Sequence, residues 1–309
     1  MPHWDERHAL LSPELHHLVI DSMLAEETSI PLRCNQLAKC ALVNKSWYAY
    51  STRLLWRELE IRIWDDGISQ KKTCGLLEAA LANPQRMSYI KHVSLDMISQ
   101  QDDIPEDTHT RPLYASRPDF FALCNFLPAV PKLGLKHNFI SDDDVMEPPN
   151  INGGSPDPRP TRMAYLLAPF FQSSILTAFC FTGRVLPLRL LMTAPNLRNL
   201  DLSHVEDCDP DDDVFPIPPF RLTRARFFNS PSIATRMAYG LDRAFSRLED
   251  LEVKQDAWDD LRAFYKLFGI AQGTLQHLTI EGGGSICKLV QLGYLLNTDV
   301  ECFRSTVLS

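Results

Sequence analysis

The sequence predicts an α/β protein in which a compact helical module at the amino end precedes an irregular solenoid built on a parallel sheet. Three observations support this fold class. A short pattern, apolar-x-x-apolar-x-apolar, recurs along the chain. Helix-like segments lie between successive copies of it, so strand and helix alternate. The chain has 309 residues and 45% hydrophobic content, which is enough for a substantial core.

Apolar side chains at helical spacing predict three short helices within residues 11–56. The first begins at Pro13, where the missing N–H costs nothing, and runs to about Leu24. The polar, β-branched residues 26–31 end it, a second helix follows, and Asn44 can cap the third. So small a module leaves some apolar surface uncovered, and such a patch marks a partner site. The alternative is an ordinary helical subdomain that closes on itself.

The order of residues in this module resembles an F-box. The motif residues are Leu11-x-Pro13-Glu14-Leu15, Leu37-x-x-Cys40-Ala41-Leu42-Val43-x-x-x-Trp47 and Leu55-Trp56-x-x-Leu59. The resemblance covers residues 9–60. It implies a three-helix unit that docks on the Skp-type adaptor of an SCF ubiquitin ligase, and through it on the cullin scaffold. The adaptor contacts it implies are Leu11, Pro13, Leu15, Leu18, Val19, Leu37, Cys40, Leu42, Val43, Trp47, Leu55 and Trp56.

The recurring triplet predicts eight short strands. Its copies begin at Trp56, Ile90, Val130, Leu176, Leu197, Leu222, Leu248 and Leu275. The spacing of the last five is nearly even and lies within the period of leucine-rich repeats, and the region resembles that class loosely. The asparagine usual three residues past the last apolar position is present only at Asn138. The alternative is an unrelated α/β domain whose strands share a short pattern.

Helix-like segments follow several of these triplets. They are Met163–Phe171, Ser232–Phe245 and Trp258–Ala271. With the strands, they divide the chain after the module into early irregular repeats at 61–140, an acidic, proline-rich insert at 141–161 that we expect to be disordered, and a leucine-rich-repeat-like solenoid at 162–309.

Two acidic segments hold most of the negative charge. Residues 141–161 contain five carboxylates against one Arg, and residues 201–220 contain seven against no Lys or Arg. Each follows a predicted strand at the same point of the repeat, so both should emerge from the same rim. They either steer a basic substrate segment towards the protein or simply keep exposed loops solvated.

The outward positions of the strands form two columns in this fold. They are Ser94, Gly134, Cys180, Asp201, Arg226, Glu252 and Thr279, and, two residues further along each strand, Asp96, Lys136, Thr182, Ser203, Phe228, Lys254 and Glu281. Mixed charges with one aromatic side chain suit protein recognition better than a small-molecule pocket. The alternative is a solvated sheet face. Because Arg and aromatic residues often anchor interfaces, we expect Arg226, Phe228, Glu252 and Lys254 to contact a substrate.

Several classes of function lack support in the sequence. The net charge of −8 comes without a basic cluster, which argues against nucleic-acid binding. No leader and no long apolar run is present, so we expect no membrane contact and a cytoplasmic or nuclear location. Eight scattered cysteines are typical of core residues in a reducing compartment. His16 and His17 are not a metal pair, and no cofactor motif or catalytic signature is present.

These observations favour a protein without catalytic activity of its own. The F-box resemblance implies a substrate-recognition subunit of an SCF-type ubiquitin ligase, with the adaptor at the amino end and a protein substrate on the repeats. Such a subunit acts by raising the effective concentration of a target lysine near activated ubiquitin. The alternatives are a ligase-independent F-box scaffold and, less expected, an α/β enzyme.

Overall fold

The structure is a computed structural model. It describes residues 13–25, 30–43, 45–62, 67–98, 122–124, 127, 130–138, 162–183, 185–186, 188–207, 217–255, 262–282 and 302–307. The chain forms two compact units. The helical unit comprises Met1–Leu59 and Ala80–Lys91, and the sheet unit comprises Glu60–Ala79 and His92–Ser309.

Three α-helices form most of the described part of the helical unit. They are α1 (Pro13–Ala25), α2 (Ile30–Cys40) and α3 (Lys45–Arg57). The start of α1 at Pro13 is as predicted. The helix α2 begins earlier than predicted, since Ile30 and Pro31 belong to its first turn, where a proline needs no N–H partner. The expected cap Asn44 lies outside the described residues.

The core of the helical unit is small. Its buried members are Ile20, Leu24, Leu37 and Cys40, with Trp47, Tyr50, Leu54 and Leu55 packed partly against them. The buried residues of α1 recur at four-residue spacing, which places them on one side of that helix. A second side of α1 therefore stays outside this core.

A short 3-10 helix, η1 (Pro84–Tyr89), also belongs to the helical unit. The guanidinium carbon of Arg86 lies 5.7 Å from the ring centroid of Trp56, and that of Arg53 lies 5.6 Å from the ring centroid of Tyr89. The backbone N–H of Lys91 donates to the carbonyl of Arg57 at 2.9 Å. These contacts join η1 to α3, so the unit includes a segment beyond the predicted module.

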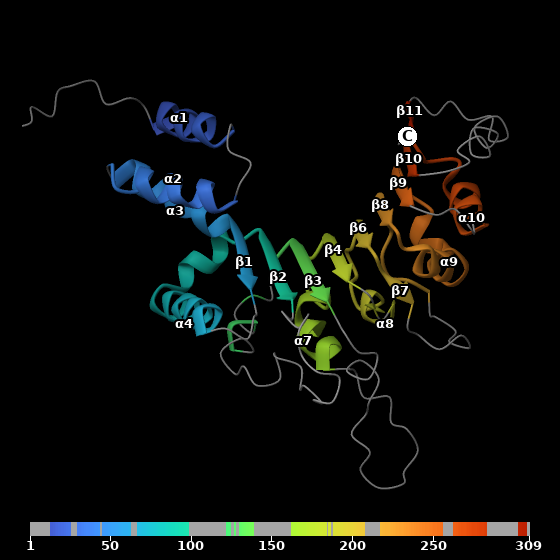
Figure 1. Ribbon diagram of the computed structural model, residues 1–309, viewed down its shortest axis with the longest axis horizontal. Coiled ribbons are helices and arrows are strands. Elements are labelled where there is room, and N and C mark those ends of the chain that lie inside the picture. The colour runs from blue at the N-terminus through green and yellow to red at the C-terminus, as the bar shows by residue number, and fades with distance from the viewer. Residues whose placement is uncertain are drawn as a thin grey trace, which may run out of the picture. The chain divides into compact units, whose positions relative to one another are not determined.

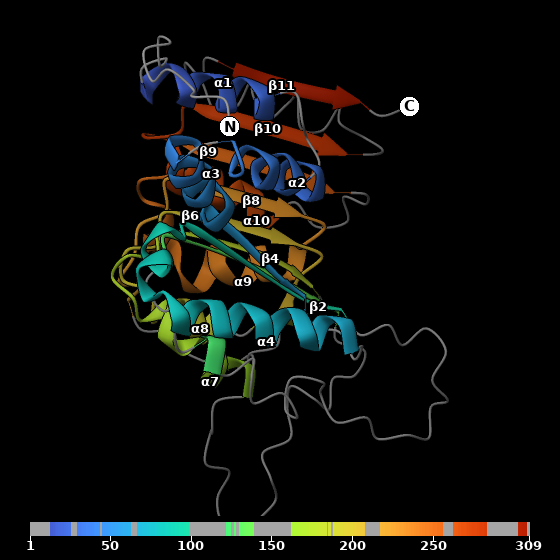
Figure 2. The ribbon, with the colours of Figure 1, turned by 90° about the vertical axis from the view of Figure 1, so that its left-hand side faces the viewer.

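Nine strands form one sheet in the order β1-β2-β3-β4-β6-β8-β9-β10-β11 (Figure 1). They are β1 (Glu58–Arg62), β2 (His92–Ile98), β3 (Lys132–Asn138), β4 (Ala178–Gly183), β6 (Asn199–Ser203), β8 (Arg224–Phe228), β9 (Asp250–Gln255), β10 (His277–Gly282) and β11 (Cys302–Val307). Every pairing from β2 to β11 is parallel, and the arrows in Figure 2 point the same way. A second, two-stranded sheet pairs β5 (Val185–Leu186) with β7 (Glu206–Asp207).

Helices connect several strands of the large sheet. They are α4 (Gly67–Ala82), α7 (Arg162–Phe171), α8 (Leu188–Leu191), α9 (Pro231–Gly240), η3 (Asp242–Phe245) and α10 (Arg262–Ala271). The helices α7, α9 and α10 lie along the same face of the sheet (Figure 1). That face buries aromatic side chains: the ring centroids of Phe171 and Phe179 are 4.7 Å apart, and those of Phe227 and Phe264 are 6.4 Å apart.

A repeated backbone contact, which we call the strand-start ladder, links the strands at their amino ends. The carbonyl oxygens of Pro131, Thr177, Arg198, Thr223 and Glu249 each accept two hydrogen bonds, from the N–H groups of residues 177 and 178, 198 and 199, 223 and 224, 249 and 250, and 276 and 277 respectively. The donor–acceptor distances are between 2.8 and 3.1 Å. Each connection is thereby tied to its neighbour before the strand begins.

The strand predictions agree with the structure. Each of the eight triplets overlaps a strand of the large sheet, and the paired residues match the two predicted columns from β2 to β10. The strand β11 was not predicted, because its sequence, CFRSTV, lacks the triplet. The predicted helix Ser232–Phe245 is two helices, since the backbone leaves helical geometry at Leu241. The acidic insert 141–161 lies outside the described residues.

Candidate functional site

The helical unit exposes many large apolar side chains. On α1 they are Leu15, Leu18, Val19 and Met23, and in the turn after α2 they are Leu42 and Val43; we call these six residues the apolar set. Leu18 is 63% exposed and Leu42 is 87% exposed. Leu32 and Tyr48 of the same unit are also exposed. Among the described residues, the helical unit thus holds most of the large apolar side chains that face solvent.

The helix α1 is apolar on two sides. His16, Ile20 and Leu24 are buried, whereas Leu15 and Leu18 are exposed. Burial of the first side accounts for the folding of the helix onto α2 and α3. The second side contributes nothing to that core, and exposing it to water is unfavourable by roughly 25 cal/mol per Å². Such a surface is typical of a site that another molecule covers.

Two residues predicted to contact a partner lie in the interior instead. Leu37 and Cys40 are each 4% exposed and belong to the core of the helical unit. Their spacing on α2 suits either role, and the sequence pattern does not show which side of a short helix faces its neighbours. They hold the three helices together, and we leave them out of the contact surface.

The other predicted contact residues occupy intermediate positions or lie outside the described residues. Trp47 and Leu55 are half-buried against the core, and Trp56 is half-buried with Arg86 over its ring. Pro13 begins α1, and its side chain is not described. Leu11 lies outside the described residues.

A polar contact between α1 and α3 was missed by the sequence analysis. The hydroxyl of Tyr50 donates to the carboxylate of Asp21, with 2.9 Å to each oxygen, and the ring of His17 stacks on the ring of Tyr50 with centroids 3.7 Å apart. Burial and the nearby Asp21 carboxylate raise the pKa of Tyr50 above its usual value. The four-residue spacing of His17 and Asp21 was the available signal, but nothing in the sequence indicates that Tyr50 lies opposite them.

The outward face of the large sheet carries the second candidate surface. The sheet register places Asp201, Arg226 and Glu252 side by side on β6, β8 and β9, and places Ser203, Phe228 and Lys254 side by side two residues further on. The four predicted substrate contacts, Arg226, Phe228, Glu252 and Lys254, are therefore neighbours on two adjacent strands.

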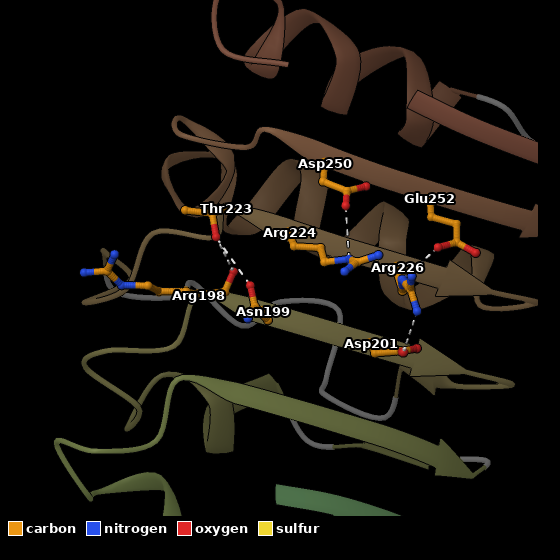
Figure 3. A network of polar contacts seen from close by, with 8 residues as sticks. All are labelled: Arg198, Asn199, Asp201, Thr223, Arg224, Arg226, Asp250 and Glu252. Atoms are coloured by element: carbon orange, nitrogen blue, oxygen red, sulfur yellow. Dashed lines mark hydrogen bonds and ion pairs between the residues drawn. The ribbon is translucent and has the colours of Figure 1, made fainter. Parts of the chain in front are cut away.

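Ion pairs connect the charged residues across these strands (Figure 3). Arg226 Nε lies 2.7 Å from Glu252 Oε2, and Arg226 Nη1 lies 3.9 Å from Asp201 Oδ2. Arg224 Nε lies 3.1 Å from Asp250 Oδ2. The signs alternate from strand to strand, so each charge has an opposite charge beside it, which favours this register. Because the side chains remain about one-third exposed, each pair contributes little to stability.

Phe228 is the aromatic centre of this surface. Lys254 Nζ lies 5.0 Å from its ring centroid and 3.3 Å from Glu281 Oε2. The imidazole of His204 contacts the same ring edge-on, at 5.1 Å between centroids. Phe228 is only half-buried, and the charges around it are paired with one another. This surface can therefore contact a protein through Phe228 without leaving a buried, unpaired charge.

The turns that follow β6 and β8 share one geometry. His204 and Asn229, which directly follow the two strands, have positive φ angles of 57° and 46°. The buried hydroxyl of Ser230 accepts a hydrogen bond from the N–H of Val205 at 2.9 Å and donates to the carbonyl of Phe228 at 2.8 Å. Ser230 occupies the position where the sequence analysis looked for asparagine, and it meets the same need for a buried polar partner.

The described residues offer little for other kinds of site. They contain no group of three or more His, Cys, Asp or Glu side chains that could hold a metal ion. Burial raises the pKa of the Cys124 thiol to about 12, which leaves it protonated and unreactive. No helix in the described part of the chain is long and apolar enough to cross a membrane.

The comparisons with protein families and with curated proteins found no match. The two candidate surfaces therefore rest on the residues and geometry above.

Proposed function

We propose that this protein is a substrate-recognition subunit of an SCF-type ubiquitin ligase. Its helical unit, an F-box in this proposal, docks on the Skp-type adaptor, and its sheet unit, a leucine-rich-repeat-like solenoid, holds a protein substrate. The chain itself does no chemistry. It brings target lysines near the activated ubiquitin that the cullin scaffold recruits, and so raises their effective concentration.

The apolar set is the observation that carries this proposal. The six side chains are exposed, and the core of their unit is formed without them by Ile20, Leu24, Leu37 and Cys40. Five of the six are also among the contacts that the F-box resemblance implies: Leu15, Leu18, Val19, Leu42 and Val43. Exposure and motif therefore agree at five residues.

The sheet unit supports the second half of the proposal. Each strand of the large sheet pairs with the next long strand along the chain, and the strand-start ladder repeats at nearly even intervals from Thr177 onward. This regularity favours a repeat architecture. Its outward face carries a half-exposed aromatic side chain among paired charges, a composition suited to protein contact.

Co-purification with a purified Skp-type adaptor tests the docking surface. We expect Leu18→Ser combined with Leu42→Ser to abolish binding, because each exposed leucine buried at an interface contributes roughly 1.5–3 kcal/mol. The loss corresponds to a dissociation constant at least about a hundredfold weaker. The matched control is Ile175→Ser combined with Ile217→Ser, which removes two exposed apolar side chains from the sheet unit.

The control variant should bind the adaptor as the wild-type protein does. Undiminished binding by the Leu18/Leu42 variant would refute the proposed docking surface, and a wild-type chain that does not bind the adaptor would refute the function.

A second experiment tests the surface around Phe228. In the assembled ligase, Phe228→Ser should reduce the ubiquitylation of substrate proteins while adaptor binding persists. Lys132→Ala, an exposed residue of β3, is its control.

A further inference from the structure

Tyr50 is held by two side chains of α1 at once. His17 stacks on its ring with an interplanar angle of 15°, and the carboxylate of Asp21 accepts the hydrogen bond of its hydroxyl. His17 and Asp21 are one helical turn apart, so they close on Tyr50 from one side of α1. We call these three residues the tyrosine clasp.

The tyrosine clasp differs in kind from the apolar contacts of α1. A second ring contact of this helix, between His16 and Trp47, is looser, with the ring centroids 5.8 Å apart and the rings tilted by 60°. Ile20 and Leu24 make an apolar contact, which has no preferred direction. A hydrogen bond and a ring stack fix direction as well as distance. Because successive residues of a helix point about 100° apart, His17 and Asp21 lie on the flank between the buried side and the exposed side that carries Leu15 and Leu18. A directional contact on that flank limits the rotation of α1 about its own axis more than the apolar contact of Ile20 and Leu24 alone would.

We propose that Tyr50 is a positioning residue for adaptor docking. It holds α1 in the rotation that presents Leu15, Leu18, Val19 and Met23 to the partner. This inference rests on the proposed function. Without the clasp, α1 samples other rotations, and the observed affinity falls in proportion to the fraction of molecules that remain competent to bind.

The test uses the full-length protein and a purified Skp-type adaptor, with the dissociation constant measured by calorimetry. Tyr50→Phe removes only the hydroxyl, and we expect the dissociation constant to rise roughly three- to tenfold, the range that corresponds to losing one typical hydrogen bond. Tyr48→Phe is the matched control. The hydroxyl of Tyr48 accepts a hydrogen bond from Arg86 of η1 at 3.4 Å, so its removal does not affect the contact between α1 and Tyr50. The Tyr48→Phe variant should bind as the wild type does.

Variants of the acceptor separate positioning from general stability. Asp21→Asn keeps a side-chain oxygen that can accept the hydrogen bond of the Tyr50 hydroxyl, so this variant should retain nearly wild-type affinity. Asp21→Ala removes the acceptor and should weaken binding as Tyr50→Phe does. Because Asp21 is exposed, neither change threatens the fold. The double variant Tyr50→Phe/Asp21→Ala should bind no more weakly than either single variant, because both remove the same contact.

Two outcomes overturn the inference alone: wild-type affinity in Tyr50→Phe, or an equal loss in Tyr48→Phe. Wild-type protein that fails to bind the adaptor overturns the proposed function and this inference together. The two failures are therefore distinguished by the behaviour of the wild-type chain.

Discussion

Asp96 shows how one buried carboxyl group responds to its surroundings. It is 6% exposed, although it occupies an outward position of β2. Burial raises its pKa above the ordinary value of 3.8, and the attraction of Lys136 and Arg62, which lowers the pKa, does not cancel that effect. The folded protein therefore binds this proton more tightly than the unfolded chain does.

The raised pKa of Asp96 gives stability a defined pH dependence. Its contribution is fully present below pH 3.8 and is lost as the pH rises through the folded-state pKa. We therefore expect Asp96→Asn to increase the free energy of unfolding at pH 7 by on the order of 1 kcal/mol, and to change it little at pH 3. Urea unfolding at the two pH values measures this. Destabilisation at pH 7 would show that the attraction to Lys136 and Arg62 outweighs burial.

Among the elements, α1 had predictable bounds but an only partly predictable role. Proline at its first position and apolar spacing define where it lies. Both of its sides are apolar, so the pattern alone does not say which side packs on α2 and α3. The same ambiguity applies to Leu37 and Cys40 of α2, which fold inward. The sequence therefore predicts that apolar surface is left over, and only the structure assigns it to particular residues.

The two sides of α1 should respond differently to truncation. Ile20→Ala removes a fully buried side chain and should lower the free energy of unfolding of the helical unit by about 2–5 kcal/mol. Val19→Ala, on the exposed side, should change it by less than about 1 kcal/mol. Thermal unfolding followed by tryptophan fluorescence distinguishes them. Equal losses would mean that Val19 is buried as well.

The strands of the large sheet were predictable because one face of each is buried. Leu251 and Val253 of β9 alternate with polar neighbours, and that alternation fixes the register of a parallel pair. The strand β11 escaped prediction because Ser305, which pairs with Ile280 of β10, stands where the triplet has its last apolar residue. The tyrosine clasp escaped it for another reason: partners on different helices leave no spacing signal in the sequence.

For the molecule as a whole, the sequence predicted the α/β class of the fold and the elements on which both candidate surfaces lie. It could not define the pairing of charges, because Arg226 has acidic neighbours on two strands and only the geometry shows that it reaches both. The identity of a protein that would bind the sheet unit has no trace in composition or spacing. That part of the function depends on shape and charge across several strands.

The strand-start ladder should be visible in hydrogen exchange from β4 to β10. The N–H groups of Ala178, Asn199, Arg224, Asp250 and His277 are bonded in the same way at successive strands. We expect all five to exchange slowly and at similar rates, as amides do when only cooperative opening exposes them. Mass spectrometry of exchanged peptides measures this. Fast exchange at one strand would show that its ladder contact is absent in solution.

The ladder also has a consequence for synthesis on the ribosome. The carbonyl of Thr177 finds its donors at Arg198 and Asn199, and the carbonyl of Arg198 in turn finds its own at Thr223 and Arg224. A nascent chain, which emerges amino end first, can therefore complete each strand's anchoring soon after the next segment leaves the exit tunnel. Growth of this sheet needs no distant carboxyl-terminal residue to begin.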